Sequence, residues 1–133
     1  MEYLCLVYLD GKQFDGVSKD ELAAIDGSSL AYDEELRRRG HLVAARALAG
    51  PQTAASVRPR AGGATMTDGP FVETKEHLGG FAVVDVPGDA EARHWAGRIA
   101  VAVGWPQGVH RFPHRIASSA DTQSEALSLT AML

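Results

Sequence analysis

Hydrophobic and polar residues follow two different periods along this chain, and each period predicts one class of element. Short apolar runs are typical of buried strands, and we expect strands over about 2–9, 41–48, 80–86 and 108–116. Two other segments repeat apolar residues at spacings of three and four, which indicates amphipathic helices. The first helix should begin at Ser18 and end at Gly40, and the second should begin at Asp89 and end at Gly104.

Capping residues support these helix limits. Ser18 and Glu21 fit a capping box, while Gly40 follows three arginines whose charge suits a helix C-terminus. Asp89 is the expected N-cap of the second helix. The inward face of the first helix should comprise Leu22, Ile25, Ser29, Tyr32 and Leu36. The inward face of the second should comprise Ala92, Trp95, Ala96, Ile99 and Val103.

The order of these elements predicts a fold. Residues 54–58 and 64–67 should form a hairpin around a Gly62-Gly63 turn. Strand, helix, strand, hairpin, strand, helix, strand is the split βαβ order of ferredoxin-like folds, an α+β class with an antiparallel sheet and both helices on one face. The other face needs cover, and a second copy packed sheet against sheet would give a symmetric homodimer.

Length and composition restrict the protein class. With 133 residues, 45% of them hydrophobic, the chain should form one packed domain. We expect this domain to span 1–116, and 117–133 to be a tail that forms either a short helix or a frayed end. The net charge of -4 argues against nucleic-acid binding. The single cysteine, Cys5, excludes an intrachain disulfide and should be a buried, inert thiol.

The hydropathy pattern also bears on location. No apolar run approaches the ~18 residues of a membrane span. The first residues lack the basic region of a signal peptide. We therefore expect a cytoplasmic protein without a membrane partner.

One polar segment identifies a family. Residues 67–80 read TDGPFVETKEHLGG and are followed by a strand that ends in VDVP. This segment resembles the signature of the DGPF proteins, part of the YCII-related family. The strands MEYLCLVY and HLVAARAL also fall where that family carries its own, so the resemblance covers about residues 1–116. It implies a dimeric α+β barrel, in which two ferredoxin-like protomers pair their sheets.

The resemblance implies less about activity, because most members of the family have no assigned reaction. Better-known YCII relatives suggest a His/Asp pair in a cleft, with the histidine on the first helix. This chain has no histidine between Ser18 and Gly40, and its helix presents Ser29 and Tyr32 instead. DGPF proteins also resemble small partners of extracytoplasmic-function sigma factors, although this chain contains no sigma-factor region.

Three residues are candidates for acid/base chemistry. Asp68 precedes Gly69-Pro70, so its carboxylate either forms an Asx turn or stands at a pocket mouth as a base. His77 could assist, because histidine exchanges a proton near neutral pH. Tyr32 could assist from the inward stripe of the first helix.

Four further residues are candidates for ligand contacts: Phe71, Glu73, Lys75 and Arg46. The charged ones could equally be solvated side chains, and Phe71 could equally anchor its loop to the core. Arg46 lies on a strand, from which it could bind an anion in a shared cavity.

We expect neither a metal nor another cofactor. Four residues of strand separate His110 from His114 by ~13 Å, too far for one ion with bonds of ~2 Å. Phosphate loops and nucleophile elbows are absent, and Gly79-Gly80 precedes a strand, where it should permit an unusual turn or a close backbone approach.

Three functions remain open at this point. The first is a cofactor-free acid/base enzyme that acts on a small organic molecule, with Asp68 as base and His77 or Tyr32 assisting. The second is a non-catalytic ligand-binding or regulatory partner in sigma-factor signalling. In the third, the polar segment serves only to build the dimer.

Overall fold

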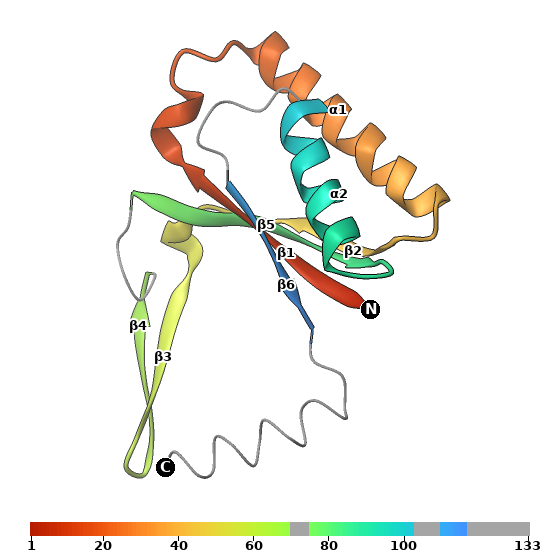
Figure 1. The fold of residues 1–133 in the computed structure, drawn as a ribbon. Helices are drawn as coiled ribbons and strands as arrows, with labels where there is room; N and C mark the ends of the chain where they lie inside the picture. Colours follow the sequence, from red (N-terminus) through yellow and green to blue (C-terminus); the bar gives the residue numbers. More distant parts are fainter. Residues whose placement is uncertain (70–74, 103–109, 117–133) are drawn as a thin grey trace.

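The computed structural model describes residues 1–69, 75–102 and 110–116 (Figure 1). In these ranges the chain forms β1 (Glu2–Asp10), α1 (Lys19–Arg38), β2 (Leu42–Ala47), β3 (Ala55–Arg60), β4 (Gly63–Asp68), β5 (Glu76–Asp85), α2 (Asp89–Ala102) and β6 (His110–Arg115). Two short 3-10 turns, η1 (Gly11–Phe14) and η2 (Pro51–Thr53), follow β1 and precede β3. The expected strand start at Gly108, helix end at Gly104 and C-terminal tail lie outside the described residues.

Four strands make the main sheet, in the order β2-β5-β1-β6, and every neighbouring pair is antiparallel. Both helices cover the same face of this sheet (Figure 1). This arrangement is the α+β, ferredoxin-like topology that the order of elements predicted.

The core lies between this sheet and the helices. Tyr3 and Cys5 of β1 and Val84 of β5 are each no more than 3% exposed and pack with Tyr32 of α1 and Trp95 of α2. The predicted inward stripes are therefore confirmed at their centres. Leu22, at the start of the first stripe, is 36% exposed instead.

Local capping fixes α1 as predicted. The Ser18 hydroxyl accepts a hydrogen bond from the Glu21 N–H at 3.1 Å, and the Glu21 carboxylate accepts one from the Ser18 N–H at 3.1 Å. Gly40 has φ 73°, a left-handed conformation that glycine adopts without strain.

The start of β5 differs from the prediction. The strand was expected to begin at Gly80, but it begins at Glu76, because residues 76–78 pair with the end of β1. A bulge makes this pairing fit: Val7 lies opposite Gly80 and Tyr8 opposite Leu78, so Gly79 is an extra residue. A Cβ on Gly80 would come within 2.9 Å of the Arg46 carbonyl oxygen, which confirms the expected close backbone approach.

The hairpin β3–β4 forms a separate two-stranded sheet. Gly62, with φ 82°, makes its turn as predicted. The hairpin extends on the side of the main sheet that faces away from both helices (Figure 1). It is joined to the main sheet through η2 and through the segment that follows Asp68.

Candidate functional site

Among the described residues, both helices lie on one face of the main sheet, and we refer to the opposite face as the open face. Strand register places four cross-strand pairs on it, since directly opposed residues share a face. These pairs are Leu4–Val83, Leu6–Phe81, Tyr8–Leu78 and Asp10–Glu76. Along β1 and β5 the open face is therefore apolar for most of its length and ends in two carboxylates. Strand β6 adds His114 opposite Leu4 and His110 opposite Tyr8 to the same face.

Asp10 is the buried member of that carboxylate pair, with an exposure of 7%. Its Oδ1 accepts a hydrogen bond from the Lys12 N–H at 3.0 Å, and its Oδ2 lies 3.5 Å from Lys75 Nζ. The Lys12 hydrogen bond, and after it the charge of Lys75, hold the pKa of Asp10 below its ordinary value of 3.8, although burial opposes them. Asp10 is therefore a fixed anion at one end of the open face.

Lys75, the ion-pair partner of Asp10, extends into solvent. Its side chain is 80% exposed, while the Asp10 side chain is only 10% exposed. A partly exposed ammonium beside a buried carboxylate can contact a ligand without leaving its partner.

The pleat of β5 separates the polar residues that the sequence grouped together. Glu76 lies opposite Asp10 on the open face, whereas His77 lies opposite Leu9 and so belongs to the other face. Both side chains are half-buried. Glu73 and Phe71, from the same predicted group, lie outside the described residues.

Asp68 stands on the hairpin rather than on the main sheet. It is the last residue of β4, lies opposite Ala55 and is exposed. Within one chain, Asp68 and His77 therefore belong to two different sheets.

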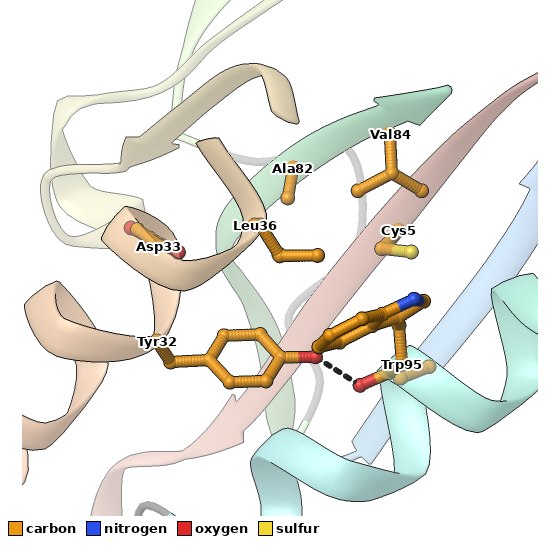
Figure 2. Close-up of a pocket in the computed structure, with 8 residues that line it drawn as sticks. Cys5, Tyr32, Asp33, Leu36, Ala82, Val84 and Trp95 are labelled. Carbon is orange, nitrogen blue, oxygen red and sulfur yellow. Dashed lines mark hydrogen bonds between the residues drawn. The ribbon is translucent and has the colours of Figure 1, made fainter. Parts of the chain in front are cut away.

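Tyr32 lies on the helix side of the sheet. Its hydroxyl donates a hydrogen bond to the Trp95 carbonyl oxygen, and its ring meets the Trp95 ring edge-on at 5.7 Å between centroids (Figure 2). The adjacent cavity, lined also by Cys5, Asp33 and Leu36, has a volume of about 10 Å³, enough for one water molecule. Tyr32 thus joins α1 to α2 on the helix side of the sheet, and its part in proton transfer stays a prediction.

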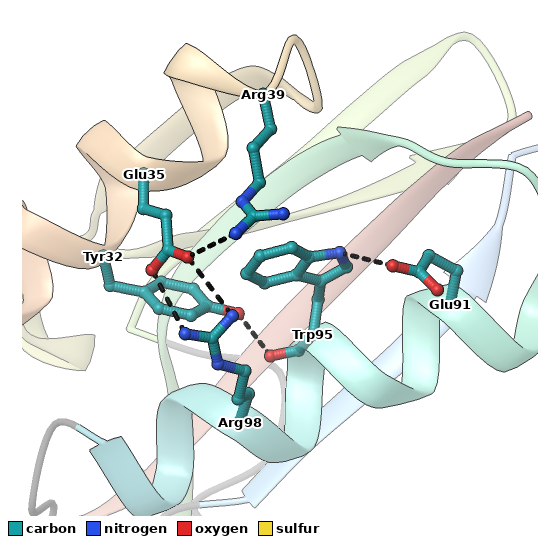
Figure 3. A network of polar contacts seen from close by, with 6 residues as sticks. All are labelled: Tyr32, Glu35, Arg39, Glu91, Trp95 and Arg98. Atoms are coloured by element: carbon teal, nitrogen blue, oxygen red, sulfur yellow. Dashed lines mark hydrogen bonds and ion pairs between the residues drawn. The ribbon is translucent and has the colours of Figure 1, made fainter.

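Sequence reasoning missed a polar network around Trp95. The guanidinium carbons of Arg39 and Arg98 lie 5.4 and 5.0 Å from its ring centroid, and Glu35 pairs with both arginines at 3.2 and 3.3 Å (Figure 3). The indole N–H donates to Glu91 at 3.0 Å. The spacing of Glu35 and Arg39 was a local signal, but Arg98 is 63 residues away in sequence. The network fastens the two helices together.

Arg46 projects from β2 beside the open face. It lies opposite Phe81, is exposed, and donates to the Ala45 carbonyl oxygen at 2.7 Å. It is a cation at the border of the apolar part of the face, and its role in binding an anion stays a prediction.

Across residues 1–69, 75–102 and 110–116, no group of three or more His, Cys, Asp or Glu side chains is placed to hold a metal ion. In the same part of the chain, neither helix combines the length and the apolar character that crossing a membrane requires.

Comparison with known proteins gives a family and two relatives. Residues 1–103 match the model of the YCII-related domain. An uncharacterized protein of Rhizobium meliloti (strain 1021) is 33% identical over 96 residues, which cover 72% of this chain and 77% of that protein. A solved structure, the 5-chloro-2-hydroxyhydroquinone dehydrochlorinase from Burkholderia phenoliruptrix AC1100 in complex with 2,5-dihydroxybenzoquinone, is similar over 90% of this chain and 97% of its own. With a TM-score of 0.48 and 16% identity, that likeness is too weak to assign a reaction.

Proposed function

Because the chain belongs to the YCII-related domain family, we propose that it is a cytoplasmic homodimer that binds a small organic molecule on its open face and moves a proton on it without a cofactor. The observation that carries this proposal is an apolar sheet face that ends in a fixed anion, Asp10, with an exposed ammonium beside it. A site of this kind combines apolar surface with a few convergent polar groups, as small-molecule sites do.

What supports a homodimer is that the described residues leave the open face without cover. Leu4, Leu6, Phe81 and Val83 remain half-exposed, although side chains of these types are usually buried in a packed domain. A second copy would cover them sheet against sheet, and the space between the two sheets would hold the ligand.

The residues on the open face suggest separate roles. Leu6 and Phe81 would contact the apolar body of the ligand, and the Lys75 ammonium would bind a hydroxyl or acidic group at the charged end. Glu76 lies on the same face as Asp10 and is the carboxylate placed to accept a proton from the bound molecule. Exclusion of water by the second sheet would strengthen these electrostatic contacts.

The experiment is a ligand titration followed by two-dimensional ¹H–¹⁵N NMR, with a panel of hydroxylated benzoates at millimolar concentration. Binding on the open face should shift the amide signals of Leu6, Phe81 and Lys75. Lys75→Met should weaken binding about tenfold, as expected for the loss of one charged contact, about 1.4 kcal/mol.

The matched control is Lys19→Met. Lys19 is an exposed lysine on α1 and is distant from β5 in sequence. It should leave the titration unchanged. If no member of the panel shifts these signals, or if the shifts map to the helices, the open face is not a small-molecule site. Glu76→Gln tests the proton transfer once a turned-over compound is found, and unchanged turnover would remove Glu76 from the reaction.

A further inference from the structure

The β3–β4 hairpin is amphipathic, and its apolar face is exposed. Opposed residues share a face, so one side of the hairpin carries the pairs Ala55–Asp68, Val57–Met66 and Pro59–Ala64. The other side carries Ser56, Arg58 and Arg60 opposite Thr67, Thr65 and Gly63. Val57 is 57% and Met66 is 75% exposed, so the described chain leaves the apolar side uncovered.

Such a hairpin needs a partner surface. An isolated two-stranded sheet is at best marginally stable in water, and it gains independent stability by packing an apolar face. Pairing along the edge of β3 is disfavoured, because Pro59 lacks an N–H and the neighbouring Arg58 and Arg60 are charged. The edge of β4 has no proline, but the exposed apolar side chains lie on the face that carries Val57 and Met66, so we expect the contact there.

We propose that this face packs on the open face of a second copy of the chain, so that each site is completed by the partner's hairpin. The hairpin extends on the side of the open face, away from the helices (Figure 1). One chain thus presents two uncovered apolar surfaces on one side, and a two-fold contact covers both at once.

Charge complementarity favours the same pairing. The apolar hairpin face ends in the carboxylate of Asp68, while the open face is bordered by the guanidinium of Arg46. Both side chains are exposed in the single chain. Packing the hairpin across the two-fold axis brings these opposite charges together and carries Asp68 to the partner's open face. This inference rests on the homodimer of the proposed function and adds a residue from the second chain to its site.

The first test is the mass in solution of Val57→Asp/Met66→Asp, measured by sedimentation equilibrium. Charges on the apolar hairpin face should raise the dimer dissociation constant at least about tenfold. Thr65→Asp, on the polar face of the same hairpin, is the matched control and should leave the mass unchanged. Near-ultraviolet circular dichroism establishes that each variant keeps the core around Trp95.

The second test uses two chains, one with Asp68→Cys and one with Arg46→Cys, both in a Cys5→Ala background. Mixed under mild oxidation, they should form a covalent heterodimer, and a mixture of Thr65→Cys with Arg46→Cys should not. If Val57→Asp/Met66→Asp remains dimeric and no cross-link forms, the hairpin contact is overturned. The proposed function is still tested separately by the ligand titration. If the wild-type protein is a monomer in solution, the proposed dimer is overturned as well. If Met66 in that monomer resists oxidation by peroxide, another part of the same chain covers the apolar hairpin face.

Discussion

The two faces of strand β1 have similar sequences but different surroundings. Tyr3 and Cys5 face the helices and are 2% and 3% exposed, whereas Leu4 and Leu6, on the alternate positions, are only half-buried. Both faces are apolar, so both require cover by the same physical argument. The difference teaches that the helix side is covered within one chain, while the described residues leave the open face and the hairpin uncovered. We propose that an assembly covers both.

The largest loss of stability should come from truncating a side chain at the centre of the core between the sheet and the helices. Trp95→Ala deletes a side chain that is 3% exposed and breaks its contacts with Tyr32, Arg39 and Arg98. We expect the free energy of unfolding to fall by about 3–5 kcal/mol. Urea denaturation measures it, with the exposed Leu30→Ala as the control. A loss as small as that of the control would mean that the helix side is not the stabilising face.

A smaller effect should come from the open face, and it should appear in assembly rather than in folding. Leu6→Asp places a charge in the proposed sheet-to-sheet contact, so the dimer dissociation constant should rise at least about tenfold, or about 1.4 kcal/mol. Light scattering over a concentration series measures this change. Leu30→Asp, on α1 at 70% exposure, is the control. An unchanged dimer dissociation constant would show that the open face of β1 does not depend on a second chain for cover.

Tyr32→Phe sharpens the comparison further. It removes the hydroxyl that donates to the Trp95 carbonyl, and it keeps the ring. The free energy of unfolding should fall by about 1 kcal/mol, as for one hydrogen bond, without any change in ligand titrations on the open face. Weaker ligand binding at unchanged stability would return Tyr32 to the reactive site.

The smallest effect at neutral pH concerns Asp10, and its sign depends on pH. A carboxyl whose pKa is lowered in the folded state stabilises the fold above its unfolded pKa, near 3.8, and loses this contribution as the pH falls through the folded pKa. Asp10→Asn should therefore lower the free energy of unfolding at pH 7. The two proteins should converge as the pH falls below about 3.8. Asp26→Asn, exposed on α1, is the control, and a difference independent of pH would contradict the ion pair and hydrogen bond at Asp10.

The sequence predicted the parts of the fold that depend on local signals. The capping box at Ser18, the glycine after α1 and the turn at Gly62 each arise from residues within a few positions of one another. The order of elements then led to the α+β topology, since few arrangements satisfy it.

The candidate site was less predictable, because its geometry depends on distant pairing. Asp10 precedes Gly11 in the sequence, and an Asx-type hydrogen bond to Lys12 could have been expected from this pair. The ion pair with Lys75 joins residues 65 positions apart, and only the register of β1 with β5 creates it. The same register separates Glu76 from His77, which a linear motif presents as neighbours.

The bulge at Gly79 has a consequence for how this family could diversify. Strand β5 turns its odd-numbered side chains to the open face after the bulge and its even-numbered ones before it. If the bulge were lost while Gly79 stayed in the strand, the pairing before it would slip by one residue, so that His77 would lie opposite Asp10 in place of Glu76. A relative of the same fold could thus exchange a carboxylate for an imidazole at its site by a change of register, with no substitution at the site itself.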